Sequence, residues 1–299
     1  MITLELPAPR RGTSIQQRMA VCLGGALVVV CCVAALYQPP ELPDPSVLKN
    51  DEPVRERDPA RAVLYQGRGI QLVKDGKWEL ALDQFRRAAA YDPINISVPI
   101  NIAYVLDKLG RYQEAIDALT DAEKIDPRNS MVYLNRGNSL INMKRFEEAL
   151  EPLQKAADLD PSNQLVCVDL GTAYNSLGRY REAAGEFEKA VALDPKNAPL
   201  IFNLATLWSK LGETDKAIQK YEQVIALEPK NLTSYYNCAV LYEKRGDLDG
   251  AIQEIRAAIK ISPDNSTLCE ILSRLLAAKT NQVPDVTAPA KSPGQESGH

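Results

Sequence analysis

The stretch Gly178–Asn197, "GRYREAAGEFEKAVALDPKN", has counterparts at 110–129, "GRYQEAIDALTDAEKIDPRN", and at 212–231, "GETDKAIQKYEQVIALEPKN". Prolines recur with it every 34 residues, at Pro93, Pro127, Pro161, Pro195, Pro229 and Pro263. We therefore expect six units that tile residues 62–265. A fixed period of this length is the sequence signature of a stacked array of supersecondary units.

A few positions in each unit accept only certain residue types, counted from unit starts at residues 62, 96, 130, 164, 198 and 232. Position 20 is always Ala, and position 8 is always Gly or Ala. Small residues on facing sides of two antiparallel helices allow the helix axes to approach to about 8–10 Å. Larger side chains fill the remaining gaps at position 24, as Phe85, Leu119, Leu153, Phe187, Tyr221 and Ile255.

The turn between the two helices carries Gly in all units but the third, which has Lys144. Gly adopts the left-handed conformation that follows a helix end at little cost, whereas Lys144 should cost about 1 kcal/mol there. Pro152, inside the second helix of the same unit, is expected to kink that helix or to remove a hydrogen bond.

With this period and these small residues, the chain resembles the tetratricopeptide repeat family over all six units. The resemblance implies an all-α fold, an α-α superhelix (solenoid), in which the first helix of each unit lines a groove. It also implies a peptide-binding groove lined notably by positions 2, 5, 6, 9, 12 and 13. The candidate residues at these positions are Asn101, Tyr104, Asn135, Asn138, Asp169, Thr172, Phe202, Asn203, Tyr236 and Asn237.

Position 6 forms a ladder of Asn side chains with Asp169 as its fourth rung. A carboxamide can both donate and accept hydrogen bonds, so it can pair with the N–H and C=O groups of an extended peptide. The ladder is similar to the one that lines the repeat superhelix of O-linked N-acetylglucosamine transferases. Asn is also frequent at this position across the family, so helix geometry or solubility is the alternative explanation. Positions 2 and 6 carry no Lys or Arg, which disfavours the version of the fold that clamps chaperone C-termini.

A further helix, at residues 266–279, is expected to cover the end of the array and keep it soluble. Thr267 and Glu270 have the spacing of a capping box at its start. The polar, Pro-rich residues 280–299 are expected to be disordered.

Residues 19–37 form an uncharged apolar run, which we expect to be a transmembrane helix. The alternative is a cleaved signal peptide, which would leave a secreted or periplasmic protein. Arginines in the tail 1–18 favour a cytoplasmic N-terminus, with the repeats outside the cytoplasm in a periplasm or lumen. The Pro-rich, charged residues 38–61 are expected to be a stiff linker.

The composition argues against catalysis and against nucleic-acid binding. The only His is His299, in the tail, so we expect no catalytic residues, no metal site and no cofactor, and we predict that the chain is not an enzyme. The chain has 35 basic and 39 acidic residues and no basic stripe, so we expect no nucleic-acid partner.

The cysteines and the Asn-x-Ser/Thr triplets add further predictions. Cys167, Cys238 and Cys269 fall on positions expected to face the core, and a single Cys238–Cys269 bridge stays open. The Ser or Thr in the Asn-x-Ser/Thr triplets that begin at Asn95, Asn231 and Asn265 is expected to cap a helix.

The sequence therefore predicts a membrane-tethered adaptor or scaffold whose groove binds an extended segment of a protein or peptide partner. The alternative is a structural assembly protein that uses its convex face or the array ends, with self-association into a homo-oligomer.

Overall fold

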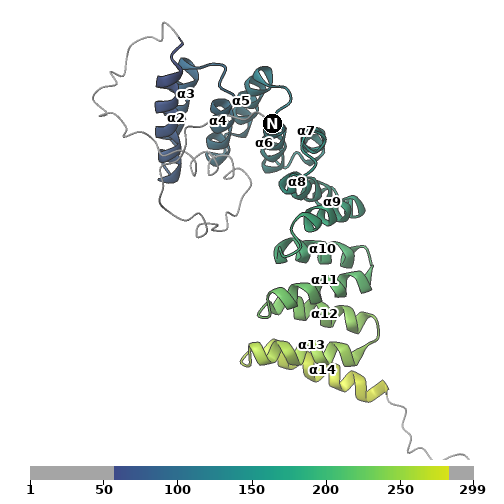
Figure 1. The fold of residues 1–299 in the computed structure, drawn as a ribbon. Helices are drawn as coiled ribbons and strands as arrows, with labels where there is room; N and C mark the ends of the chain where they lie inside the picture. Colours follow the sequence, from purple (N-terminus) through teal and green to yellow (C-terminus); the bar gives the residue numbers. More distant parts are fainter. Residues whose placement is uncertain (1–56, 283–299) are drawn as a thin grey trace, which may run out of the picture. The chain divides into compact units, whose positions relative to one another are not determined.

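The computed structural model describes residues 57–282, which contain thirteen helices and no strand. The chain divides into two compact units, Met1–Ile125 (unit 1) and Asp126–His299 (unit 2). The described part of unit 1 holds α2 (Pro59–Lys74), α3 (Trp78–Tyr91), α4 (Ser97–Lys108) and α5 (Tyr112–Ile125) (Figure 1). That of unit 2 holds α6 (Ser130–Asn142), α7 (Phe146–Leu159), α8 (Gln164–Ser176), α9 (Tyr180–Leu193), α10 (Ala198–Lys210), α11 (Thr214–Leu227), α12 (Leu232–Lys244), α13 (Leu248–Ile261) and α14 (Ser266–Gln282).

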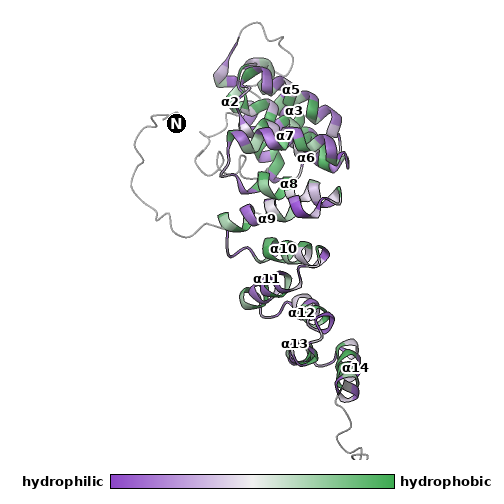
Figure 2. Ribbon diagram, turned by 90° about the vertical axis from the view of Figure 1, so that its right-hand side faces the viewer, coloured by the Kyte–Doolittle hydropathy of each residue, from purple (hydrophilic) through white to green (hydrophobic). Residues whose placement is uncertain are grey.

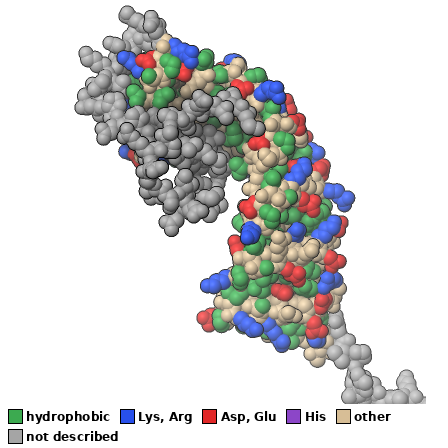
Figure 3. Space-filling view, viewed as in Figure 1, with side chains coloured by type: hydrophobic (Ala, Val, Ile, Leu, Met, Phe, Trp, Pro, Cys, Tyr) green, Lys and Arg blue, Asp and Glu red, His purple; other side chains and the backbone are tan. Residues whose placement is uncertain are grey.

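Even-numbered helices from α2 to α12 are the first helix of a pair, and the odd-numbered helix that follows packs against each of them. Figure 2 shows that apolar and polar residues are mixed along each helix, as expected where one side is buried and the other meets water. On the face of unit 2 seen in Figure 3, Lys and Arg are interspersed with Asp and Glu.

Six asparagines, each at position 34 of the repeat, hold the starts of α4, α6, α8, α10, α12 and α14. The side-chain oxygen of each accepts a backbone N–H of the following helix at 3.1–3.3 Å. This cap typically stabilises by about 0.5–2 kcal/mol. The expectation that Ser or Thr of the Asn-x-Ser/Thr triplets would be the cap is wrong, because the Asn itself reaches the free N–H groups. The Thr267–Glu270 capping box is wrong for the same reason, since Asn265 accepts from the Leu268 N–H.

The start of α2 and the end of α14 differ from the expected boundaries. Pro59 to Arg61, assigned to the linker, form the first turn of α2, where the Asp58 carboxylate accepts the Arg61 N–H at 3.1 Å. Proline is well suited to this first turn because its missing N–H would have no partner there. At the other end, α14 continues to Gln282, three residues beyond 279.

The turn after each first helix ends in the left-handed conformation, with φ of 70–84° at Gly76, Gly110, Gly178, Gly212 and Gly246. Lys144 adopts the same conformation, with φ of 59°. Its N–H bonds to the Ile141 carbonyl at 2.8 Å, and the next N–H bonds to the Leu140 carbonyl at 2.9 Å, as in the glycine turns. The strained geometry predicted for Lys144 is therefore confirmed.

The helices of a pair approach closely because position 8 is small. A Cβ added to Gly171 would lie 2.8 Å from the ring of Phe187, and one added to Gly69 would lie 2.6 Å from the ring of Phe85. Both rings are buried. The predicted packing of position 8 against position 24 is therefore confirmed in these pairs.

Pro152 is buried within α7, and the helix continues through it without a break. We have no physical account of why a proline is tolerated at this position. At the end of unit 2, α14 packs on α13 and buries Leu268 and Leu275, while Leu276 stays 39% exposed.

Several expected segments lie outside the described residues. These are the tail 1–18, the apolar run 19–37, the linker as far as residue 56, and the tail from residue 283. Within residues 57–282, none of the helices combines the length and the apolar character needed to cross a bilayer.

Replacing Lys144 by Gly should raise the free energy of unfolding by about 0.5–1 kcal/mol. The left-handed strain of about 1–2 kcal/mol is removed, and the greater freedom of Gly in the unfolded chain offsets part of that gain. Urea unfolding of both proteins measures the difference. An unchanged or lowered free energy of unfolding would show that this turn is not strained.

Gly171→Ala should lower the free energy of unfolding by about 1–2 kcal/mol, because Phe187 must move to accommodate the added methyl group. Gly185→Ala, in the partner helix α9, is the matched control, since no heavy atom lies within 4 Å of its added Cβ. That substitution should stabilise by about 1 kcal/mol through helix propensity alone. Thermal unfolding of the two variants should therefore move in opposite directions, and shifts in the same direction would contradict the packing argument.

Candidate functional site

The predicted groove residues of unit 2 lie on one side of its first helices, here called the first-helix face: Asn135, Asn138, Asp169, Thr172, Phe202, Asn203, Tyr236 and Asn237. Their exposure is uneven. Asn135 is 5% exposed, whereas Asn203 is exposed and Tyr236 is 43% exposed. In unit 1, Asn101 and Tyr104 are 4% and 6% exposed. The face is therefore not a uniform ladder of accessible amides.

Asp169 and Asn138 come together from α8 and α6. Burial raises the pKa of the Asp169 carboxyl to about 7, and a hydrogen bond from the Asn138 side chain opposes this rise. Two predicted site residues thus form one polar pair. Because the carboxyl loses or gains its proton near neutral pH, its charge changes with pH in that range.

Other polar groups of the face are used within the fold. The Thr172 hydroxyl donates to the Val168 carbonyl at 2.8 Å, one turn earlier in α8. Asn237 hydrogen-bonds the hydroxyl of Tyr221, which also lies 3.0 Å from the Thr206 hydroxyl. Desolvation raises the pKa of Tyr221, so this buried phenol stays neutral and holds α10, α11 and α12 together.

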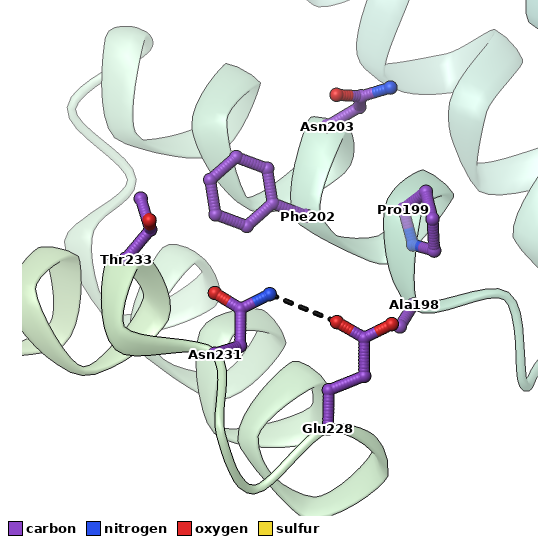
Figure 4. A pocket seen from close by; sticks show the side chains of 7 residues that line it. All are labelled: Ala198, Pro199, Phe202, Asn203, Glu228, Asn231 and Thr233. Carbon is purple, nitrogen blue, oxygen red and sulfur yellow. Dashed lines mark hydrogen bonds between the residues drawn. The ribbon is translucent and has the colours of Figure 1, made fainter. Parts of the chain in front are cut away.

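A pocket of about 250 Å³ opens where α10 meets the turn between α11 and α12 (Figure 4). It brings together the predicted residues Phe202 and Asn203. Phe202 also stacks edge-on against Tyr221, with ring centroids 5.4 Å apart, which fixes this wall of the pocket. The remaining lining residues are Ala198, Pro199, Glu228, Asn231 and Thr233.

The sequence interpretation missed Glu228 and Thr233 as site residues. One signal was available, because the residue before the repeated proline is Asp in four units and Glu only at position 228. The Asp side chain turns back onto its own backbone: the Asp194 carboxylate accepts the Lys196 N–H at 3.3 Å and the Asn197 amide at 3.4 Å. Glu228 keeps only the second of these bonds, from the Asn231 amide at 3.0 Å.

The cysteine expectations are corrected in part. Cys167 and Cys238 are buried, but Cys269 is exposed, because it lies on the side of α14 away from α13. All three are free thiols, so the Cys238–Cys269 bridge is not formed. Desolvation raises the pKa of Cys238 to about 12, which makes its thiol unreactive.

Asp169→Asn should change how stability depends on pH. The folded pKa of about 7 lies above the ordinary value of 3.8, so between pH 4 and 7 the folded protein binds a proton that the unfolded chain lacks. The wild-type protein therefore loses stability as pH rises through this window, at up to about 1.4 kcal/mol per pH unit. The Asn variant lacks this loss, so its stability relative to wild type should rise by about 1 kcal/mol or more from pH 5 to pH 8.

Urea unfolding at the two pH values tests this, with the exposed loop residue Asp264→Asn as control. At both pH values the free energy of unfolding of the control should equal that of wild type. A parallel pH profile for Asp169→Asn and wild type would contradict the raised pKa.

Sequence models of the tetratricopeptide repeat match residues 67–130, 100–164, 140–206, 176–219 and 232–265, and a TPR repeat model matches residues 209–246. Together they cover residues 67–265 without a gap, about two thirds of the chain. No curated protein matches the sequence.

Several solved structures share the fold. YrrB, described as a TPR protein with an unusual peptide-binding site, is 23% identical with a TM-score of 0.55, covering 66% of this chain and 97% of its own. A MamA protein is 25% identical with a TM-score of 0.53, covering 57% and 94%. PilF of Pseudomonas aeruginosa is 24% identical with a TM-score of 0.57, covering 72% and 97%. Repeat spacing, helix pairing and these matches agree, and the chain belongs to the tetratricopeptide repeat family.

Proposed function

We propose that this protein is a membrane-tethered adaptor that binds an extended segment of a partner protein on the first-helix face of unit 2. The tetratricopeptide repeat fold is typical of protein-interaction adaptors. The observation that carries the proposal is the exposed amide of Asn203 beside the pocket that Phe202 lines. An amide next to an aromatic wall can hold both the backbone and a side chain of a bound peptide.

The exposure pattern narrows the binding surface to α10 and α12. Tyr236 is 43% exposed and Val240, one turn later on α12, is 42% exposed, so both offer apolar area beside Asn203 and Asn237. Asn135 is too buried to pair with a ligand, and we leave it out of the contact surface. Each amide pairing contributes only about 0.5–1.5 kcal/mol net, so apolar contacts must supply much of the affinity.

The tether and the placement of the repeats belong to the same proposal. Residues 19–37 would anchor the chain in the membrane. Residues 1–18 would lie in the cytoplasm, and the six 34-residue repeats would lie outside the cytoplasm. The support is the uncharged apolar run and the arginines before it. A full-length chain that stays in the soluble fraction after cell lysis would contradict the tether.

Asn203→Ala should weaken the binding of extended peptides about three- to tenfold while leaving the fold intact, because it removes one donor and one acceptor from an exposed site. Random twelve-residue peptides selected by display on the full chain supply the probes. Their dissociation constants for wild type and variant are then compared by fluorescence polarisation.

Gln219→Ala is the matched control, because it removes an exposed carboxamide from α11, a second helix. It should leave the dissociation constants unchanged. Failure to select any peptide, or equal loss of affinity in both variants, would count against binding at the first-helix face.

The alternative is self-association through the end of the array, and the 39% exposure of Leu276 on α14 favours it as a second candidate. In that case Asn203→Ala would leave self-association unchanged. The mass of the chain in detergent, measured by light scattering, would exceed that of one chain and would fall with Leu276→Lys.

A further inference from the structure

The pocket at α10 has a chemical character that amide pairing with a peptide backbone does not explain. One wall is apolar, made by Ala198, Pro199 and the ring of Phe202. The facing side carries Glu228, the only charged residue of the lining. Figure 4 shows the Glu228 carboxylate extending beside Asn231 toward the start of α10. The pocket thus combines an apolar wall with a single negative charge.

The longer side chain of Glu228 accounts for this charge. At the equivalent Asp194, both carboxylate oxygens are held within the turn, by the Lys196 N–H and by the Asn197 amide. In the α11–α12 turn Glu228 accepts no bond from the equivalent backbone N–H, that of Lys230, and its Oε2 accepts the Asn231 amide. With the extra methylene, only Oε2 stays bonded within the turn, and Oε1 is left available to a ligand.

The nearby helix starts do not turn this pocket into an anion site. The Leu200 N–H at the start of α10 is held by Asn197 at 3.3 Å, and the Ser234 N–H at the start of α12 is held by Asn231 at 3.1 Å. With these donors satisfied, the full charge of Glu228 outweighs the partial positive charge of a helix N-terminus.

We infer that this pocket binds one long basic side chain, Lys or Arg, of the extended segment. The inference rests on the proposed function and specifies the chemistry of its ligand. The methylene stem would lie against Phe202 and Pro199, as such stems do on apolar surface, and the cationic end would meet Glu228. The volume of about 250 Å³ is below the ~300–1,000 Å³ of small-molecule sites, which suits one side chain.

The probe is Nα-acetyl-lysine N-methylamide, with Nα-acetyl-norleucine N-methylamide as its uncharged counterpart of similar length. Each is titrated into the full chain in detergent and followed by transverse-relaxation-optimised NMR of the backbone amides of Asn203, Asn231 and Thr233. We expect the lysine amide to bind at least fivefold more tightly than the norleucine amide.

Glu228→Asp is the decisive variant, because it keeps the charge but should return the carboxylate to the turn, as in Asp194. It and Glu228→Gln should both reduce lysine binding to the norleucine level. Glu188→Gln, an exposed acid on α9 outside the pocket, should leave the preference unchanged. Thr233→Lys gives a test that leaves Glu228 in place. The ammonium of the introduced Lys should fill the pocket and abolish the NMR shifts that the lysine amide causes.

Equal binding of the two amides by wild type, or an undiminished lysine preference in Glu228→Asp, would overturn the inference. Its failure is distinguishable from failure of the proposed function. If no displayed peptide binds while the lysine preference persists, the pocket chemistry stands without the extended-segment role. If peptides bind through Asn203 while the lysine preference is absent, the adaptor role stands without the basic side chain.

Discussion

The contact between position 8 of the first helix and position 24 of the second determines how closely each helix pair can pack. In two pairs the small residue is a Gly whose absent side chain makes room for a buried phenyl ring, Phe85 or Phe187. The close approach lets alanines with no exposed surface, such as Ala81 and Ala183, fill the rest of the interface. Interior packing has little free space, so one methyl group at this contact is enough to disturb the pair.

The packing of the helices also determines which polar side chains are exposed and can contact a partner. Positions that match in the repeat do not match in exposure: Asn135 is buried, Asn237 is bonded to Tyr221, and Asn203 faces solvent. Asp169 has lost enough water to hold its proton near neutrality. Side chains at matching repeat positions of unit 2 therefore differ in exposure and in bonding, and α10 carries the exposed Asn203 beside the pocket that Phe202 lines.

The sequence predicts the helix pairs well because their determinants are local and repeat every 34 residues. Gly, Ala and the residue before each proline act on their own turn or on the facing helix, and even the strain at Lys144 could be predicted from its neighbours in the alignment of units. Exposure could not be predicted in this way, because it depends on which groups surround a side chain in three dimensions.

Two features are visible in the sequence, but their structural meaning depends on which atoms a side chain can reach. The Asn at position 34 recurs in every repeat and caps the next helix, although the neighbouring Ser and Thr are also residue types that favour caps. The change from Asp to Glu at 228 is conservative in charge. The structural effect of this change is seen only when the hydrogen bonds of the longer Glu228 side chain are compared with those of Asp194 in the equivalent turn.

In unit 2, the helices that pack extensively are neighbours along the chain, from α6·α7 to α13·α14. Such nearest-neighbour packing makes the energy of the array a sum over adjacent elements. With an anchor at residues 19–37 and a partner held at α10 and α12, as proposed above, tension between anchor and partner would run through the helices that precede α10 and not through α14. The end element α14, which packs on α13, would stay outside this load path, so its local unfolding would leave α10 and α11 in place.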